Sequence, residues 1–190
     1  MANTETLNIY LADLPGKILW PSPIRVTLQQ YFSRIVSKHG DVKSAMVQWT
    51  SRPPPLSDHD LLLYFVVDPD DTVVKTGLGS PNSIEADANG HTVRRLSDGL
   101  TGSEAYFSGR QNEPVMLAKL AFHELFHNVT QMDDELHGKA GLGLGRKKIL
   151  SGTQLTDGDV NLMVAHLTTT KRSQWKDGFS HYHDPFRKGP

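Results

Sequence analysis

The chain has 190 residues, of which 20 are lysine or arginine and 21 aspartate or glutamate, for a formal net charge of −1. Its length suits one domain with a core of its own, and its composition is that of an ordinary globular protein. The near-neutral charge, with no basic stripe containing interleaved aromatics, argues against nucleic-acid binding. Cysteine is absent, so disulfides and cysteine–zinc sites are excluded.

The N-terminus does not have the pattern of a secretion signal or a membrane anchor. Residues 1–20 lack a basic n-region and a continuous apolar stretch, and no apolar run is long enough to cross a bilayer. We therefore expect a protein that works in the cytoplasm or leaves the cell by a route without a cleaved signal, unless a signal precedes residue 1. Oligomeric state is not predictable from these features.

The first half of the chain predicts three strands and a helix. Residues 7–11 have the pattern of a short strand, and residues 24–38 that of an amphipathic helix. Residues 42–50 alternate in part and predict a second strand. A loop with three consecutive prolines follows at 51–60. Residues 61–67 are continuously apolar, which predicts a central strand buried on both faces.

The segment before the longest predicted helix is irregular. Residues 76–103 are rich in Gly, Ser, Asn and Asp, which predicts loops with a hairpin near residues 91–96. Residues 103–108 predict one more strand. A strand in this position can border an active-site cleft and pair with an extended peptide, which would bring Tyr106 near the site. Alternatively, Tyr106 is an ordinary strand residue with no part in binding.

Residues 113–132 predict a long buried helix. Pro114 stands near its start, where the missing N–H costs nothing, and good helix formers fill much of its first half. Apolar residues occur on most sides, so this helix should lie at the centre of the fold. An H-E-x-x-H motif occupies residues 123–127 within it.

The spacing of this motif predicts a zinc site. On a helix, His123 and His127 lie one turn apart on the same face, so both imidazoles can bind one ion. Glu124, at the edge of that face, can reach a water on the metal without being a ligand. Zinc would lower the pKa of this water and polarise a carbonyl, while Glu124 takes the proton and later delivers it to the leaving amine. The alternative is a chance motif with two hydrogen-bonded core histidines.

A glycine-containing loop and a short helix follow the motif. The five glycines from Gly138 to Gly152 make a loop that can fold back under the metal. Thr156 is a natural N-cap for a final helix, with Asp157 and Asp159 in the first turn, where the helix dipole favours acids. The polar and aromatic tail at 171–190 predicts no particular element.

The third zinc ligand has two serious candidates. A catalytic zinc needs three protein ligands and an open position. Asp133 is six residues after His127, and His137 is ten residues after it. Imidazole is the commoner zinc ligand, and the candidate that does not bind can still support the site through a hydrogen bond. If neither binds, Asp133 is one of three consecutive exposed acids and His137 an ordinary loop residue.

The motif region resembles the metzincin family of zinc metallopeptidases. The family pattern is H-E-x-x-H-x-x-G-x-x-[H/D], and residues 123–133 read H-E-L-F-H-N-V-T-Q-M-D. This aspartate variant is similar to the small bacterial secreted metzincins, and residues 155–167 resemble the C-terminal helix of the matrix-type members. Thr130 replaces the family glycine, and no methionine stands near Leu150, where the family has its Met-turn. Without that glycine we expect the motif helix to run a turn longer, which favours His137 while leaving both candidates open.

The resemblance implies an α+β, zincin-like fold. It would have a twisted mixed sheet of about four to five strands, a backing helix, a central helix with the motif and a C-terminal helix. We expect one domain over residues 1–190. Within it, a sheet subdomain would cover about 1–132 and a C-terminal subdomain about 133–190.

The activity that the resemblance implies is zinc-dependent hydrolysis of peptide bonds in a protein or peptide substrate. Tyr106, His166, Tyr182 and His183 are candidates for contacting the oxyanion of the substrate. Two alternatives share the same motif. One is a zinc-binding module or inactive relative that acts through protein contacts. The other is a zinc amidase acting on a cell-wall peptide or another non-protein amide.

Overall fold

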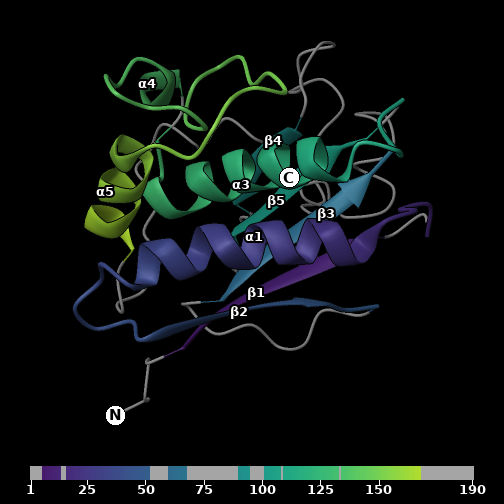
Figure 1. Cartoon of the computed structure of the whole chain (residues 1–190), viewed down its shortest axis with the longest axis horizontal. Helices are drawn as coiled ribbons and strands as arrows, with labels where there is room; N and C mark the ends of the chain where they lie inside the picture. Colours follow the sequence, from purple (N-terminus) through teal and green to yellow (C-terminus); the bar gives the residue numbers. More distant parts are fainter. Residues whose placement is uncertain are drawn as a thin grey trace, which may run out of the picture.

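The computed structural model describes residues 6–13, 16–51, 60–67, 90–94, 101–107, 109–132 and 134–167. In this part of the chain, a mixed sheet is covered on one face by two helices that lie side by side (Figure 1). The helices are α1 (Pro21–Val36) and α3 (Pro114–Thr130). The fold is therefore α+β, as expected.

Five strands form the sheet in the order β2-β1-β3-β5-β4. The first four strands of this order run parallel, and β4 pairs antiparallel with β5. The edges of the sheet, within the described residues, are β2 and β4. The strands are β1 (Thr6–Asp13), β2 (Ser44–Trp49), β3 (Leu61–Val66), β4 (Gly90–Arg94) and β5 (Thr101–Tyr106).

The apolar run at 61–67 forms the central strand that the sequence predicts. β3 lies between β1 and β5, and all its residues except Tyr64 are buried. Where the sequence predicts a hairpin near residues 91–96, residues 90–94 form the single strand β4, which pairs antiparallel with β5, and residues 95 and 96 lie outside the described residues. The remaining residues of the predicted loops, at 52–59, 76–89 and 95–100, lie outside the described residues.

The interpretation of residues 103–108 as a strand that pairs with a peptide is wrong. β5 pairs with β3 through Val66 and Tyr106, and with β4 through Gly90 and Ala105. Both sides of its backbone are therefore engaged, and no position is left for an added strand. β4, which comes from the irregular glycine-rich segment, takes the outer position instead.

The helix α1 begins three residues earlier than the sequence pattern indicates. Pro21 and Pro23 occupy the first turn, where a proline loses no helical hydrogen bond. Its buried side chains face the core, and the rings of Tyr31 and Phe32 contact Phe122 of α3 with centroids 5.4 and 5.6 Å apart. Aromatic contacts of this kind fix one helix against the other.

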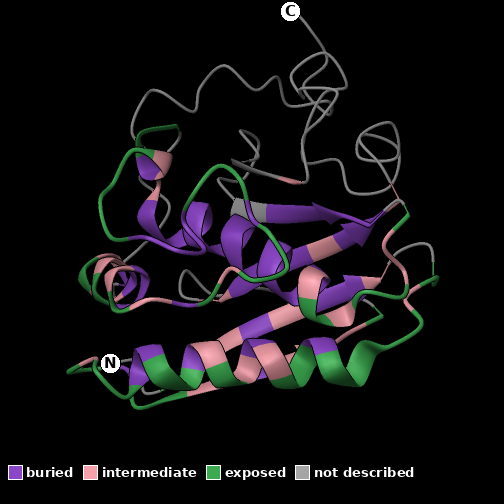
Figure 2. Cartoon of the chain, turned by 45° about the horizontal axis from the view of Figure 1, so that its top comes forward, coloured by how far each residue is buried: buried purple, intermediate pink, exposed green. Residues whose placement is uncertain are grey.

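The motif helix α3 is the buried centre of the fold, as predicted. Every residue from Leu117 to Thr130 is buried. In Figure 2 this part of the helix is purple, and a loop with exposed residues, in green, passes in front of it. The expectation of an extra turn is wrong, because the helix ends at Thr130. Gln131 adopts the left-handed conformation with φ 53°, and its N–H donates to the carbonyl of His127 at 2.8 Å. A non-glycine residue thus makes the turn that glycine usually makes.

Two helices follow, α4 (Asp134–His137) and α5 (Asp157–His166). The predicted N-cap of α5 forms as a capping box between Thr156 and Asp159. Arg34 of α1 holds the start of α5 through an ion pair with Asp157 at 2.8 Å. None of the helices in the described ranges is long and apolar enough to span a bilayer.

Candidate metal centre

Three histidines meet at the C-terminal half of α3. His123 and His127 lie one turn apart on α3, and His137 is the last residue of α4. The Nε2 atoms of His123 and His127 are 3.1 Å apart. Nε2 of His137 lies 3.2 Å from that of His127 and 3.3 Å from that of His123. The three nitrogens thus form a nearly equilateral triangle, and the cluster could hold a metal ion.

The triangle has the dimensions of three ligands around one tetrahedral ion. With metal–nitrogen distances of about 2.0–2.1 Å, tetrahedral geometry separates two ligand nitrogens by roughly 3.3–3.4 Å. The observed separations of 3.1 to 3.3 Å are close to this value. The rings of His123 and His137 stack with an angle of 7°, and the ring of His127 stands edge-on to both. One ion can therefore contact all three rings.

The other ring nitrogen of each histidine has an acceptor. Nδ1 of His123 donates to the carbonyl of Leu144 at 2.7 Å. Nδ1 of His127 donates to the carbonyl of Met132 at 2.7 Å. A carbonyl only accepts, so in both neutral rings the proton lies on Nδ1 and the lone pair on Nε2. Nδ1 of His137 lies 3.2 Å from a carboxylate oxygen of Asp134, which favours the same tautomer.

Burial keeps the two motif histidines neutral. Loss of solvation lowers the pKa of His123 to about 3, and the neighbouring His127 adds to this effect. Burial likewise lowers the pKa of His127 to about 4. At neutral pH both Nε2 atoms therefore present lone pairs at a distance where two lone pairs repel. A bound cation removes this repulsion, which is the physical reason to regard the cluster as a metal centre.

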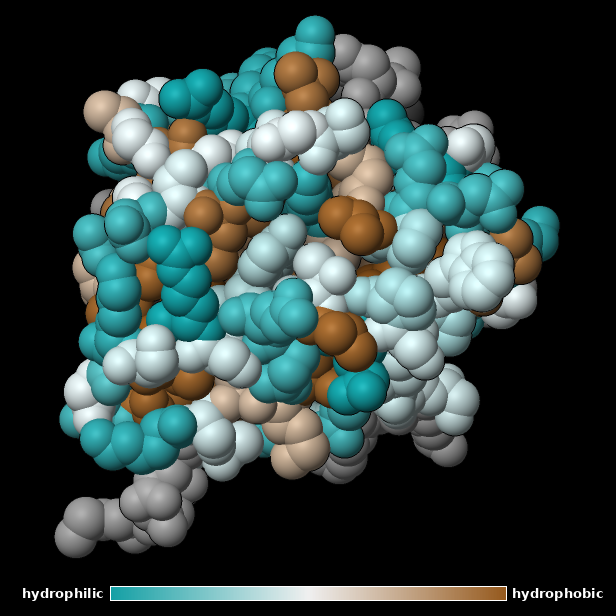
Figure 3. All heavy atoms as spheres, in the orientation of Figure 1, coloured by the Kyte–Doolittle hydropathy of each residue, from teal (hydrophilic) through white to brown (hydrophobic). Residues whose placement is uncertain are grey.

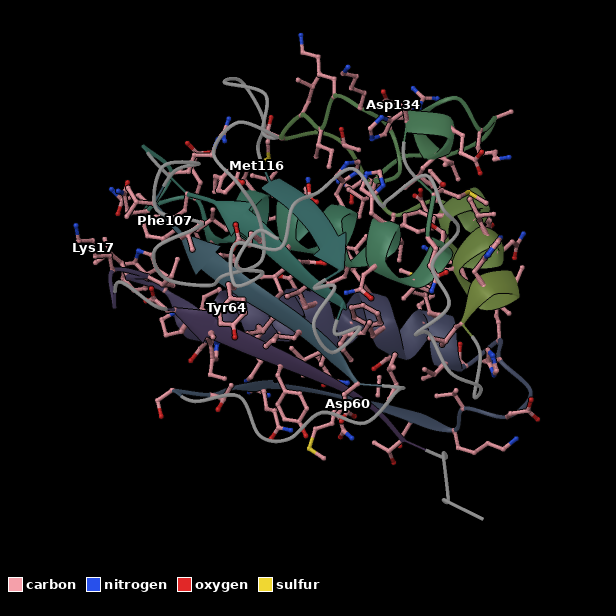
Figure 4. All side chains as sticks on the ribbon, turned by 180° about the vertical axis from the view of Figure 1, so that it is seen from behind. Lys17, Asp60, Tyr64, Phe107, Met116 and Asp134 are labelled. Atoms are coloured by element: carbon pink, nitrogen blue, oxygen red, sulfur yellow. The ribbon has the colours of Figure 1, made fainter. Side chains whose placement is uncertain are left out.

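The left-handed turn at Gln131 orients His127. Because the chain reverses there, the carbonyl of Met132 returns to the ring of His127. Thr130, at the position of the expected glycine, stays in the helix, and its hydroxyl donates to the carbonyl of Phe126 at 2.8 Å. The turn also leads directly into α4, which supplies His137. Figure 4 shows Asp134, at the start of α4, at the opposite end of α3 from Met116.

The predicted glycine loop does fold back under the histidines, and Asp159 holds it there. The carboxylate of Asp159 is fully buried. It accepts the backbone N–H groups of Gly143, Leu144 and Gly145 at 3.0–3.1 Å. This places the Leu144 carbonyl beneath His123. Glycine is required at Gly143, where a Cβ would lie 2.1 Å from the carbonyl oxygen of Gln154.

This role of Asp159 is missing from the sequence interpretation, which places it only in the first turn of a helix. Two signals point to it in hindsight. One is the close spacing of Gly143 and Gly145, which frees backbone N–H groups to approach an acceptor. The other is an acid at the third residue of the helix, a position where the carboxylate faces the preceding loop.

Glu124 lies between α3 and the sheet. It is 6% exposed, and its backbone carbonyl accepts the hydroxyl of Ser103 on β5 at 3.1 Å. Asn128 donates to the same hydroxyl at 3.3 Å. The Glu124 side chain lies against β4, because a Cβ on Gly90 would be 2.7 Å from Cγ of Glu124. Gly90, which the sequence interpretation missed, thus makes room for the Glu124 side chain.

The remaining candidates do not join this cluster in the described residues. Ser103 faces α3, so strand alternation places Tyr106 on the opposite face of the sheet. His166 is the last residue of α5. Asp133, Tyr182 and His183 lie outside the described residues.

Comparison of the chain with models of protein families, with curated proteins and with solved structures found no match. The chain's own residues therefore carry the functional argument. They provide a cluster of three histidines that could hold a metal ion, and the acidic residue Glu124 directly follows one of them, His123, in the sequence.

Proposed function

We propose that this protein is a zinc-dependent hydrolase of peptide bonds with a zincin-like fold. The observation that carries this proposal is the triangle of Nε2 lone pairs from His123, His127 and His137. Three protein ligands leave one tetrahedral position open, which is the arrangement of a catalytic zinc rather than a structural one. In this proposal His137, and not Asp133, is the third ligand.

The donor atoms favour zinc over other common ions. Calcium and magnesium prefer oxygen ligands, and the triangle consists of nitrogen alone. Imidazole suits zinc, copper, iron and nickel, and of these zinc most regularly adopts four-coordinate tetrahedral geometry. The short separations between the nitrogens support that geometry.

The residues around the metal position have separable tasks. Zinc, when bound, supplies Lewis-acid chemistry that activates water and polarises a carbonyl. Glu124 takes a proton from the attacking water and delivers it to the leaving amine nitrogen. The carbonyls of Leu144 and Met132 keep the rings of His123 and His127 in the tautomer that binds metal.

A sheet edge beside Glu124 favours an extended peptide as substrate. β4 is an edge strand among the described residues and contacts Glu124 at Gly90. An extended peptide can pair with such an edge. The other edge, β2, is covered by the side-chain amide of Gln29, which donates to the carbonyl of Ala45 at 2.8 Å and accepts the N–H of Val47 at 2.9 Å.

The test begins with metal content and then turns to cleavage. We expect about one zinc per chain in the dialysed wild-type protein by elemental mass spectrometry, and loss of this zinc in His123→Ala. Glu124→Gln should keep the zinc and lower cleavage in a quenched-fluorescence peptide library by at least about 100-fold, since general acid–base catalysis contributes roughly 10²–10⁴-fold. Full cleavage by Glu124→Gln would refute the assigned mechanism.

A second candidate is a zinc-binding module that does not cleave peptides. The departures at Thr130 and Leu150 from the family pattern favour it. Stoichiometric zinc without cleavage of any library peptide would support this candidate. Cleavage of a cell-wall amide, with the same dependence on Glu124, would instead support an amidase.

A further inference from the structure

Lys119 is a buried cation on the motif helix. It is 2% exposed, and no other described lysine or arginine is buried. Its Nζ donates to the backbone carbonyl of Ser151, and it makes no ion pair with a carboxylate of the described residues. An ammonium has three donors, so two remain. A buried ammonium without a counter-charge is costly, and such a cost is tolerated where a ligand supplies the missing charge.

The helix places Lys119 beside the metal position. It precedes His123 by one turn, so their β-carbons are about 6 Å apart. At about 100° per residue, Lys119 is about 40° to one side of His123, and Glu124 about 100° to the other. The two flanks also contact different elements. Glu124 lies against β4, whereas Lys119 binds the loop that leads to α5. A peptide bond at the metal would thus have Glu124 on one flank and Lys119 on the other.

The same loop carries further positive charge. Its Leu144 carbonyl contacts His123, and its Ser151 carbonyl contacts Lys119. Between these contacts stand Arg146, Lys147 and Lys148, which are exposed and form no ion pair with any residue that the structure describes. In Figure 3, hydrophilic side chains lie among more apolar ones at the top of the molecule, where Figure 1 draws the loop after α4. The Lys119 flank of the centre is therefore locally cationic, although the whole chain has a net charge of −1.

We propose that Lys119 lies at the bottom of a subsite that binds a carboxylate of the substrate. This carboxylate would lie within about two residues of the scissile bond. This inference rests on the proposed peptidase function. The carboxylate belongs either to an aspartate or glutamate side chain or to the C-terminus of the peptide. Charge-assisted hydrogen bonds to the two remaining donors would hold it. Met116, three residues before Lys119 and half-buried, is its neighbour on the surface of α3 and suits the methylene groups of a glutamate.

The loop residues 146–148 have a different task from Lys119. They are exposed, so salt screens their effect, and they act on the approach of an acidic peptide rather than on its final position. Lys119 is buried, so its effect should persist at high salt. Measuring the preference for acidic peptides at low and at high salt therefore separates the effect of residues 146–148 from that of Lys119.

The test uses the zinc-loaded full chain and matched peptides that carry Glu, Gln or Lys at each of the positions flanking the cleaved bond. Each peptide is made with a free and with an amidated C-terminus, which distinguishes the two sources of carboxylate. At one position, or at the free C-terminus, we expect kcat/KM of the wild type to favour the carboxylate by at least about tenfold, as expected for a buried polar partner. Lys119→Met should reduce this ratio to about one, because it should lower kcat/KM for the carboxylate peptide by at least about tenfold more than for the Gln peptide. Lys17→Met, at an exposed site, is the matched control and should keep the wild-type ratio.

Binding provides a readout that does not need turnover. In the zinc-loaded Glu124→Gln background, calorimetric titration with the same peptides should show the same preference, with loss in Lys119→Met and retention in Lys119→Arg. A preference that persists in binding without any cleavage by the wild type would uphold the subsite and refute the peptidase. Equal losses for Glu and Gln peptides in Lys119→Met, or no Lys119-dependent preference in binding, would refute the subsite while leaving the zinc and Glu124 tests unaffected.

Discussion

Replacement of Asp159 by asparagine should damage both the stability of the fold and the affinity for zinc. One carboxylate oxygen accepts the N–H groups of Gly143 and Gly145 at 3.1 and 3.0 Å. The other accepts the N–H groups of Leu144 at 3.0 Å and Thr156 at 2.8 Å. An amide keeps only one acceptor oxygen. In either orientation of the side chain, an NH₂ group therefore faces backbone donors.

The cost follows from the less damaging orientation. If the amide nitrogen replaces the oxygen near Gly145, that N–H stays buried without an acceptor, which costs roughly 1–3 kcal/mol. The bonds to Leu144 and Thr156 survive but lose the assistance of the negative charge, which costs about 1 kcal/mol each. We expect a loss of roughly 3–5 kcal/mol in the free energy of unfolding. Because the Leu144 carbonyl orients His123, zinc affinity should fall by about 10–100-fold.

Two measurements separate these effects. Chemical denaturation of the metal-free protein gives the stability, and competition with a chromogenic chelator gives the zinc Kd. Asp157→Asn is the matched control, since Asp157 lies in the same helical turn but is exposed and contacts Arg34 and Lys38 at the surface. Equal stability and equal zinc Kd in the two variants would refute the assignment of Asp159 as the support of the site.

Further predictions concern ligands, protons and backbone. His137→Ala should lose zinc and Asp133→Ala should retain it, by elemental analysis; the reverse result would exchange their roles. In metal-free protein, acidification from pH 7 to 5 should lower the free energy of unfolding by roughly 2 kcal/mol for each motif histidine, because the unfolded rings, with pKa 6.5, bind protons that the folded rings, with pKa about 3 and about 4, do not. A flat profile in urea titrations would contradict this. Gly90→Ala should displace Glu124 and the end of β4, because the new Cβ would lie 2.7 Å from Cγ of Glu124 and 2.3 Å from the carbonyl oxygen of Glu104. Peptide cleavage should fall at least about tenfold with zinc content unchanged, as expected when a general base is misplaced. Gln131→Val should lose roughly 2 kcal/mol of stability through its left-handed conformation, and Gln131→Gly should lose less, since glycine adopts that conformation without strain; equal melting temperatures of the two variants would refute this.

The position of His137 beside the motif histidines shows where local reasoning reaches its limit. Sequence rules assign left-handed turns to glycine, and Thr130 in its place suggests a longer helix. In the structure the helix ends there anyway, because Gln131 takes the left-handed conformation. Its N–H bonds the carbonyl of His127, and the chain reversal supplies an acceptor to the His127 ring. These two hydrogen bonds offset the cost of the left-handed conformation at Gln131, which propensity scales count as unfavourable for a residue other than glycine.

The role of strand β5 depended on a contact distant in sequence. The strand predicted at residues 103–108 before the motif helix is confirmed as β5, with bounds Thr101–Tyr106. Which strand lies at the edge depends on where β4 pairs, and β4 comes from a segment with weak local signals. Tyr106 could therefore be considered near the site until the pairing placed it on the opposite face of the sheet.

By itself, the sequence determined the features that depend on spacing along the chain. These are the buried motif helix, two histidines one turn apart, the N-cap at Thr156 and a glycine loop able to turn back, because helical periodicity and backbone freedom are local properties. Only the tertiary structure decided which residues converge from separate elements. His137 completes the nitrogen triangle, Asp159 holds the loop beneath it, and Lys119 lies buried without a counter-charge in the described chain. Burial and the partners of polar groups depend on how elements pack, and packing is not encoded in any one segment.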